Sequence, residues 1–218
     1  NYTAIIDNKP VIILGAGTVG KLALDIFNSN DQVIYCFLDD NKELHGTEIN
    51  DVSILSDCDD RGYLKFIGNK CDAFIASDDT KYRKSIAETI IKERKVMPVN
   101  AIHNLANVSP LSSVGYGNMI GMGALINAYA TIGHHNLINS GVIIDAEVTI
   151  GNFVQIGIGS NIGANVEIAE GAFIGSGVTI VQGVKIGKNA RIGIGSVVIA
   201  DVAKDDTVFG NPAASVKR

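Results

Sequence analysis

The chain has 218 residues, of which 46% are hydrophobic and 19% are charged, and its formal net charge is −5. The hydrophobic content excludes an intrinsically disordered chain, and the length suits one large domain or two small ones. The acidic balance and the lack of any run of Lys or Arg argue against a nucleic-acid or membrane surface, so the expected partner is a small molecule.

Cysteine content and hydropathy indicate the cellular compartment in which the protein is expected. Cys36, Cys58 and Cys71 are odd in number and have no CxxC spacing, so we expect neither a disulfide framework nor a metal site. No apolar run reaches the ~20 residues that a transmembrane helix needs, and residues 1–9 lack the basic and apolar regions of a signal peptide. We therefore expect a cytoplasmic protein with reduced thiols.

The first hundred residues alternate short apolar runs with helical patterns. Val11–Leu14 is a candidate buried strand that leads directly into residues 15–20, which read Gly-Ala-Gly-Thr-Val-Gly. A helix is expected from about Lys21 to Phe27. A strand, a glycine-rich turn and a helix in this order are typical of a parallel α/β unit.

Two further strands extend this unit. Val33–Leu38 is the second predicted strand and ends at a pair of aspartates. Ala73–Ala76 is the third, and it precedes a helix that Asp79 or Thr80 is expected to cap. The pattern predicts an α/β, Rossmann-like domain over residues 1–100.

A six-residue period runs through the second half. Seventeen positions taken in steps of six from Ile102 to Val198 are all Ile or Val. The next residue is often Gly, and the residue four positions after the aliphatic is mostly small or Val. Residues 101–200 also hold 17 of the 24 glycines. A change of composition this sharp marks a second domain, over residues 101–218.

One inward aliphatic and one small residue in every six suit a triangular coil. Each hexapeptide forms one flat side, and three of them complete a turn. Stacked coils then pair as parallel strands and bury continuous ladders that no single repeat can bury alone. The second half is therefore predicted to be an all-β, left-handed parallel β-helix of five to six coils.

These repeats, together with the closing Gly210-Asn211-Pro212-Ala213, resemble the hexapeptide-repeat acyltransferases. Fused to a glycine-loop domain, they are similar in particular to bacterial nucleotide-sugar N-acetyltransferases and their sialic acid O-acetyltransferase relatives. The resemblance implies acetyl-CoA as co-substrate, a nucleotide-sugar acceptor and a homotrimer. It also implies that the acceptor's nucleotide is held by Gly15, Gly17, Gly20, Asp39 and Asp40.

The glycine loop has a physical interpretation that is independent of any family. Glycines let backbone amides approach a phosphate at a helix N-terminus, and a carboxylate at the end of the next strand can bind a sugar hydroxyl or a base edge. The alternative is a tight strand-to-helix turn without a ligand. A dehydrogenase is disfavoured, because about 90 residues supply only half of a dinucleotide fold.

The sequence departs from the resembled family at the general base. There, a histidine follows Glu in a Glu-His-Asp-Cys segment, and a second histidine lies in a Phe-Val-His-Ile segment. Here these positions are Ala146 and Gln155. Transfer to an amine needs an unprotonated nucleophile, so Asp145, Glu147 and His134 are the candidate replacements. The alternative for both carboxylates is a solvated surface.

Coil geometry constrains these candidates. Asn127 and Asp145 are one coil apart, so we expect them to stack, whereas His134 belongs to a different side of the prism from Ala146. His134 therefore serves as a base only if it faces the site of a neighbouring subunit. The alternative is that His134 and His135 are solvated corner residues.

The expected contacts of coenzyme A follow from the resemblance and from the late basic residues of the helix. Lys185, Lys188 and Arg191 are the only basic residues between 101 and 200. A solvated face is the alternative for them. The predicted set is Gly157, Ala164, Gly175, Gly193, Lys185 and Arg191.

Three functions remain open from the sequence. The first is an acetyl-CoA-dependent N- or O-acetyltransferase that acts on a nucleotide-linked amino sugar. The second is a catalytically silent trimer that keeps the ligand pockets. The third is an acyltransferase on another small acceptor, in which the N-terminal domain is only a scaffold.

Overall fold

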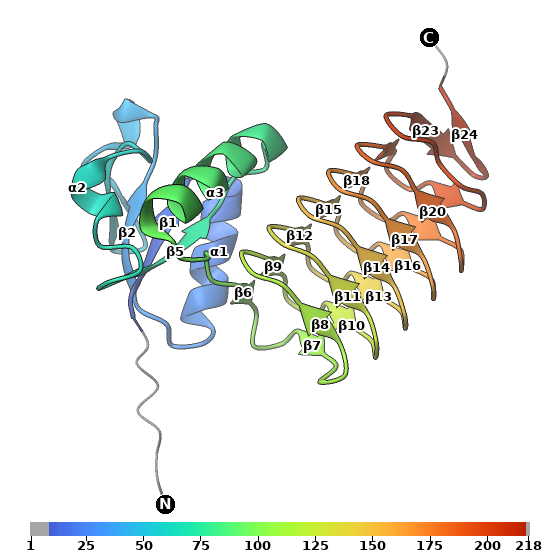
Figure 1. Ribbon diagram of the computed structural model, residues 1–218, viewed down its shortest axis with the longest axis horizontal. Helices are drawn as coiled ribbons and strands as arrows, with labels where there is room; N and C mark the ends of the chain where they lie inside the picture. The colour runs from blue at the N-terminus through green and yellow to red at the C-terminus, as the bar shows by residue number, and fades with distance from the viewer. Residues whose placement is uncertain (1–8, 217–218) are drawn as a thin grey trace, which may run out of the picture.

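The computed structural model describes residues 9–216, which form an α/β unit at one end of a long triangular prism (Figure 1). The sequence predicts no signal peptide in residues 1–9. Of these, residues 1–8 lie outside the described residues. Within residues 9–216, no helix is long and apolar enough to cross a membrane. The three cysteines are buried free thiols.

The α/β unit is built on a five-stranded sheet with the order β3-β4-β2-β1-β5. All neighbouring strands are parallel except β3 and β4, which form an antiparallel hairpin. The strands are β1 (Val11–Leu14), β2 (Ile34–Leu38), β3 (Glu48–Ile49), β4 (Val52–Ser56) and β5 (Asp72–Ile75). The predicted Rossmann-like unit is confirmed, with the hairpin as an addition.

Two longer helices and two short ones complete this unit. They are α1 (Thr18–Asn28), α3 (Thr80–Arg94), the one-turn α2 (Arg61–Leu64) and the 3-10 turn η1 (Lys42–Leu44). Helix α1 begins three residues before the predicted start, because the last glycine of the loop already lies in its first turn. Asp79 caps α3 as predicted, with its carboxylate accepting from the amides of Lys81 and Tyr82.

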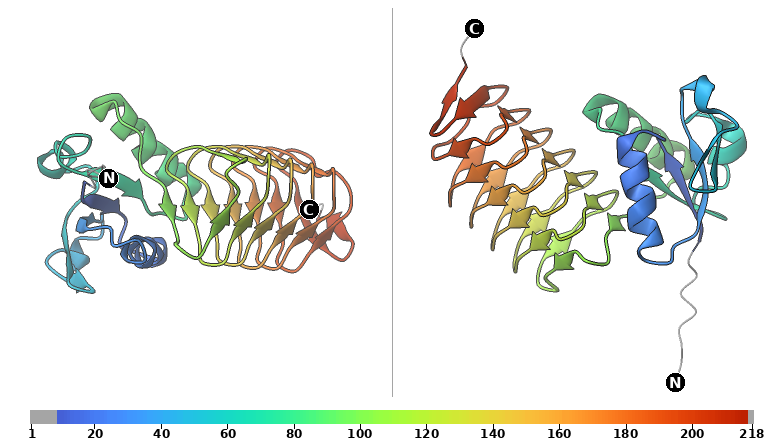
Figure 2. Two further views of the ribbon diagram at one scale, coloured as in Figure 1. Left: turned by 90° about the horizontal axis from the view of Figure 1, so that it is seen from below. Right: turned by 180° about the vertical axis from the view of Figure 1, so that it is seen from behind.

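The prism consists of three sheets that the chain visits in turn, and their strands are parallel except for the last one, Ala213–Ser215, which is antiparallel to its neighbour (Figure 2). Residues one coil apart are paired, as Ile126 is with Ile144 and Ile144 is with Ile162. The inward aliphatics and the small residues form one continuous core. The predicted left-handed β-helix is confirmed.

We number the sheets in the order in which the chain meets them from residue 107 onward, since the strand before it belongs to sheet 3, and name each corner by the two sheets that it joins. Sheet 1 contains β7 (Asn107–Val108), β10 (Leu125–Ile126), β13 (Ile143–Ile144), β16 (Asn161–Ile162), β19 (Thr179–Ile180) and β22 (Val197–Val198). Sheet 2 contains β8 (Ser113–Val114), β11 (Thr131–Ile132), β14 (Thr149–Ile150), β17 (Glu167–Ile168) and β20 (Lys185–Ile186). Sheet 3 contains β6 (Ala101–Ile102), β9 (Met119–Ile120), β12 (Leu137–Ile138), β15 (Gln155–Ile156), β18 (Phe173–Ile174), β21 (Arg191–Ile192), β23 (Thr207–Gly210) and β24 (Ala213–Ser215).

The α/β unit covers the first coils of sheet 3. The outward side chains of Met119 and Leu137 are buried with Leu24 and Phe27 of α1 in one apolar cluster. At the end of α1, Asn30 Nδ2 donates to the carbonyl of Ile102 at 2.8 Å. The two parts therefore share a packed junction, and the loops that follow the parallel strands lie beside the prism.

Candidate functional site

A pocket of about 300 Å³ opens at the carboxyl ends of β1, β2 and β5. Ligands of parallel α/β sheets bind at this edge, where loops meet the N-terminus of a helix. Its walls come from the glycine loop, the two aspartates after β2 and the loop after β5. The lining residues are Gly15, Gly17, Thr18, Val19, Asp39, Asp40, Cys58, Ala76, Ser77, Asp78 and Tyr82.

The three glycines of the loop differ in whether the structure leaves room for a side chain. A Cβ on Gly15 would lie 2.3 Å from the carbonyl oxygen of Ala76, and the φ of Gly15 is +112°. A Cβ on Gly20 would lie 2.1 Å from the carbonyl oxygen of Gly15. Both are required by the turn itself. Gly17 has an ordinary φ of −74°, and a Cβ there would meet no atom within 4 Å. Its missing side chain leaves open space in the pocket.

Asp39 holds the glycine loop in place. Its Oδ2 accepts from the amide of Ala16 at 2.7 Å, and its Oδ1 accepts from the amide of Asn41 at 2.8 Å. Each carboxylate oxygen has a further lone pair that a ligand hydroxyl or amine can use. Asp39 therefore braces the loop and also offers acceptors to the pocket.

Asp40 closes the opposite wall. Its Oδ1 accepts from the amide of Cys58 at 2.8 Å, and its Oδ2 accepts from the hydroxyl of Tyr82 at 2.7 Å. Burial raises the pKa of Cys58 to about 12 and also raises the pKa of Tyr82. At neutral pH both are protonated, so Tyr82 acts as a donor and Cys58 is not a thiolate nucleophile.

A second hollow of about 480 Å³ adjoins the pocket and shares Asp78 with it. It is floored by outward residues of sheet 3, where the guanidinium of Arg191 lies 4.5 Å from the ring centroid of Phe173. Gln155 Nε2 donates to the carbonyl of Asp78 and, at 3.4 Å, approaches Thr80 Oγ1. The position of the second family histidine is thus occupied by a side chain that ties the prism to the pocket loop.

Asp145, Ala146 and Glu147 form the corner between sheets 1 and 2. Asp145 Oδ1 accepts from Asn127 Nδ2 at 3.0 Å, which confirms the predicted stacking, and also from the amide of Ala146 at 2.8 Å. Glu147 is exposed with a φ of +60°. In the triangular cross-section of the prism, this corner lies opposite sheet 3, and sheet 3 is the side that contacts the α/β unit. One chain therefore does not bring these carboxylates to the pocket.

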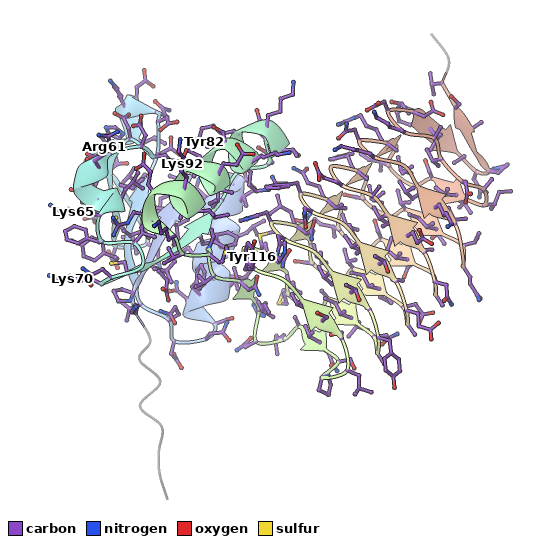
Figure 3. All side chains as sticks on the ribbon, in the orientation of Figure 1. Arg61, Lys65, Lys70, Tyr82, Lys92 and Tyr116 are labelled. Atoms are coloured by element: carbon purple, nitrogen blue, oxygen red, sulfur yellow. The ribbon has the colours of Figure 1, made fainter. Side chains whose placement is uncertain are left out.

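His134 and His135 lie at the corner between sheets 2 and 3, so His134 is on a different side from Ala146, as predicted. The ring of His134 stacks on Tyr116 at 3.8 Å, on the side of the first coil that faces the α/β unit (Figure 3). His135 is only 2% exposed and stacks on Phe153 at 5.0 Å. Burial lowers the pKa of His135 to about 4. The alternative of a solvated corner residue is wrong for His135, because the aromatic rings of adjacent coils enclose it.

The helix glycines predicted to contact coenzyme A have a packing role that needs no ligand. A Cβ on Gly157 would lie 2.4 Å from the amide nitrogen of Ser176, and one on Gly175 would lie 2.8 Å from that of Ile194. A Cβ on Gly193 would meet the Phe209 ring. The next coil excludes a side chain at each position. Their occurrence after the aliphatic is therefore no independent sign of a cofactor.

The remaining residues of the predicted coenzyme A set are spread over the prism. Ala164 lies at the corner between sheets 1 and 2. Lys185 projects from sheet 2 and pairs with Glu167 at 2.9 Å, whereas Arg191 projects from sheet 3. Lys188, at the corner between them, pairs with Glu170 at 3.2 Å. The described structure does not gather these cations into one cluster.

Sequence reasoning missed Arg83, which is fully buried between the two parts of the molecule. It also missed Tyr82 and the loop at Ser77 and Asp78, which line the pocket. An arginine in an amphipathic helix ordinarily faces solvent, so the residue type gave no signal. The loop followed a correctly predicted strand, and its place at the carboxyl end of β5 was the signal that was available.

Two family models match parts of the chain. Residues 147–182 match the bacterial transferase hexapeptide model (six repeats), and residues 10–90 match the PglD N-terminal domain. A comparison with curated protein sequences gives no match. The chain thus joins a PglD N-terminal domain to hexapeptide repeats.

Solved structures match over nearly the whole chain. A variant of GDP-perosamine N-acetyl transferase from Caulobacter crescentus, with one histidine replaced by alanine and with CoA and GDP-perosamine bound, is 27% identical with a TM-score of 0.89. That match covers 96% of this chain and 97% of the other. The acetyltransferase domain of PglB from Neisseria gonorrhoeae FA1090 in complex with acetyl coenzyme A is 25% identical, with a TM-score of 0.79 and coverage of 96% and 100%.

WeeI from Acinetobacter baumannii AYE is also 25% identical, with a TM-score of 0.80 and coverage of 95% and 99%. These structures share both parts of the chain, in the same order. The predicted resemblance to hexapeptide-repeat nucleotide-sugar acetyltransferases is confirmed.

Proposed function

We propose that this chain, which has the two-part architecture of the hexapeptide-repeat nucleotide-sugar acetyltransferases, transfers an acetyl group from acetyl-CoA to the amino group of a nucleotide-linked sugar. The observation that carries the proposal is the pocket beside Gly17, where the glycine loop leaves free space for a ligand. The likeness to a GDP-perosamine N-acetyl transferase supports the same class of acceptor.

The pocket is assigned to the nucleotide. The N-terminal amides of α1 point toward the space beside Gly17 and suit a diphosphate, because a helix N-terminus favours negative charge. Asp39 offers carboxylate acceptors at the end of β2. Asp78 lies where the pocket meets the second hollow, so a sugar attached to the diphosphate extends past Asp78 toward Gln155.

In the transfer step the acceptor nitrogen attacks the thioester carbonyl. A carbon–nitrogen bond forms, the carbon–sulfur bond breaks, and the proton lost by the amine ends on the thiolate of coenzyme A. An ammonium group has no lone pair, so the amine must be neutral when it attacks. Asp145 is assigned as the base, because Asn127 and the amide of Ala146 fix its Oδ1 and so orient the carboxylate. No described residue donates a hydrogen bond to its Oδ2.

Asp145 reaches the pocket only from a second copy, so the proposed site lies between subunits of a homotrimer. Apolar side chains along the edge of sheet 1 support this assembly. Ile158 and Ile194 are 61% and 78% exposed at the corner between sheets 3 and 1, and Leu125 and Ile143 project from sheet 1 itself. Exposed apolar ladders of this kind mark contact surfaces, and a closed ring repeats one contact three times.

The proposal is tested by thiol release from acetyl-CoA in the presence of UDP- and GDP-linked 4-amino sugars, from about pH 6 to pH 9. Release that depends on the acceptor is expected, and it rises with pH as the amine loses its proton. Asp145→Asn is expected to remove most of it, while Lys188→Ala, at a solvated ion pair, serves as the control. Release that no nucleotide sugar stimulates would refute the proposal.

Ala146 supports a second candidate, a trimer that binds the nucleotide sugar without turnover. The position that holds the base in the resembled family carries a methyl group here, and a methyl group accepts no proton. Calorimetry separates the two candidates. A silent protein binds the nucleotide sugar and acetyl-CoA together and releases no thiol at any pH, whereas the enzyme releases it.

A further inference from the structure

Arg83 is the most deeply buried charged residue that the structure describes, with no exposed surface. It projects from α3 into the junction with the prism. Its Nη1 donates to the carbonyl of Ser77 at 2.5 Å, and its Nε donates to the carbonyl of His135 at 3.1 Å. Nη2 reaches the carbonyl of Phe153 at 3.4 Å. One guanidinium thus joins the pocket loop to two successive coils.

All three of these contacts are to backbone carbonyls, and no described carboxylate forms an ion pair with Arg83. Asp78 and Asp79 are the acidic groups that act on it from the same loop, and burial lowers its pKa to about 10. Burying an unpaired cation costs free energy that an apolar side chain of similar volume would not cost. Stability alone therefore gives no reason for an arginine at this position.

The segment that Arg83 holds, Ser77–Thr80, is fixed from the other side as well. Gln155 on β15 donates to the carbonyl of Asp78 and approaches Thr80 Oγ1. Ser77 lines the nucleotide pocket, Thr80 lines the second hollow, and Asp78 lines both. Two side chains, one from each part of the molecule, thus set the position of the loop between the two hollows.

We propose that Arg83 is a positioning residue for acyl transfer: with Gln155, it locks the Ser77–Thr80 loop against the prism, and so sets where a nucleotide-bound acceptor presents its amine. The inference rests on the proposed function, because it assigns the acceptor to the α/β unit and the acetyl donor to the prism. A displacement of about 1 Å between reacting groups costs roughly 10²-fold in rate. A donor and an acceptor held by different parts of a molecule need a fixed junction.

Arg94 provides a matched control on the same helix. Its Nε donates to the carbonyl of Ile67 at 3.1 Å and its Nη2 donates to the carbonyl of Lys65 at 2.9 Å, so both contacts stay within the α/β unit. The experiment compares Arg83→Met, Arg83→Lys, Gln155→Ala and Arg94→Met. The readouts are kcat, KM for the acceptor, and calorimetric affinities for the nucleotide sugar and for acetyl-CoA.

Arg83→Met is expected to lower kcat by roughly 10²-fold and to leave both affinities within about threefold of native, because the binding surfaces stay intact while their register is lost. Arg83→Lys is expected to keep part of the native kcat, since one ammonium group cannot contact all three carbonyls. Gln155→Ala lowers kcat by about tenfold, and Arg94→Met leaves it unchanged. Equal kcat values for Arg83→Met and Arg94→Met, or a loss that follows only the unfolded fraction, would overturn the inference.

Hydrogen exchange separates this inference from the proposed function. If the native protein transfers no acetyl group, the proposed function fails, but the loop can still be measured. The amides of residues 77–82 are expected to exchange faster in Arg83→Met than in Arg94→Met, because only the first variant releases the loop. Identical exchange in the two variants would refute the positioning role whether or not the native protein is active.

Discussion

Glycine is used in both parts of the molecule, but the space beside it differs. In the α/β unit a side chain on Gly17 would enter open space in a pocket, whereas on the prism a side chain on Gly175 would enter the next coil. The sequence pattern does not distinguish these two cases, since both glycines follow an aliphatic run at a turn. Open space beside a glycine with an ordinary φ leaves room for the proposed ligand, whereas filled space accounts for the glycine by packing alone.

The same contrast applies to the polar residues of the two parts. Asp39 and Asp40 face a pocket that is complete within one chain. Asp145 is held as firmly, by Asn127, but it faces away from the α/β unit. The N-terminal part therefore has a pocket that one chain completes, whereas the proposed chemistry of the prism requires a second copy of the chain.

The largest effect is expected at the prism corner where Ala146 replaces the histidine of the resembled family. Ala146→His restores an imidazole beside Asp145, and a positioned general base is worth roughly 10² to 10⁴ in rate. Thiol release with a nucleotide-linked amino sugar is expected to rise in this variant. Adding Gln155→His tests the second family position, but it also removes the contact of Gln155 with the pocket loop. Unchanged activity in Ala146→His would exclude this corner as the place of transfer.

A smaller effect is expected in the pocket. Gly17→Val fills the open space beside the loop, and overpacking costs about 1–3 kcal/mol, which is roughly 5- to 150-fold in nucleotide-sugar affinity. The affinity for acetyl-CoA should stay at the native value, and the midpoint of thermal unfolding should fall only slightly, because Gly17 caps α1 and valine is a poorer N-cap than glycine. Calorimetry measures both affinities. Full nucleotide affinity in Gly17→Val would mean that the loop is a turn without a ligand.

On the prism the same kind of change should affect folding and not binding. Gly175→Ala pushes its Cβ against the next coil and is expected to cost about 2–3 kcal/mol of unfolding free energy. Gly177 is the control: its φ is +65° and nothing lies within 4 Å of its Cβ position. Gly177→Asn should therefore be close to native in denaturant titrations at one protein concentration. A native-like Gly175→Ala would show that the stacking does not require glycine.

The smallest effect is a pH dependence at the junction. The pKa of His135 is lowered to about 4 by burial, with His134 and Arg83 as the neighbouring cationic groups. The unfolded chain, with an ordinary pKa of about 6.5, then binds more protons between about pH 6.5 and pH 4, so stability is lost as pH falls through that range. About 2 kcal/mol is expected to disappear between pH 7 and pH 5.

The variant His135→Asn tests the origin of that slope, because asparagine tolerates the positive φ at this position and does not titrate. Its unfolding free energy should change less between pH 7 and pH 5 than that of the native protein. The comparison uses the slope alone, since the loss of the stacked ring also changes the absolute stability. If the unfolding free energy changes equally with pH in both proteins, groups other than His135 cause the pH dependence.

The sequence was a good guide where structure repeats or where one strand leads into the next. A period of six over seventeen positions specifies the coil, and β1, β2 and β5 were found within two residues of their ends. The β3–β4 hairpin was missed because β3 has only two residues, although Asn50 and Asp51, both with positive φ, form a turn that was open to recognition.

The part of the site that the sequence did not predict depends on long-range contacts. Arg83 is distant in sequence from the prism residues that it contacts, and no local pattern predicts that one guanidinium meets the carbonyls of a loop and of two coils. His135 was expected to be solvated for the same reason. Its burial follows from rings on the coils above and below and from the helix that covers them.

The most direct test of the account is to identify the product. Native protein is incubated with acetyl-CoA and a UDP- or GDP-linked 4-amino sugar, and the nucleotide sugar is analysed by mass spectrometry beside a Gly17→Val sample. The account predicts that the native protein adds one acetyl group to the sugar amine for each thiol released, and that Gly17→Val does so much more slowly at the same acceptor concentration. A nucleotide sugar that stays unmodified while the protein binds it, or thiol release without an acetylated sugar, would contradict the account.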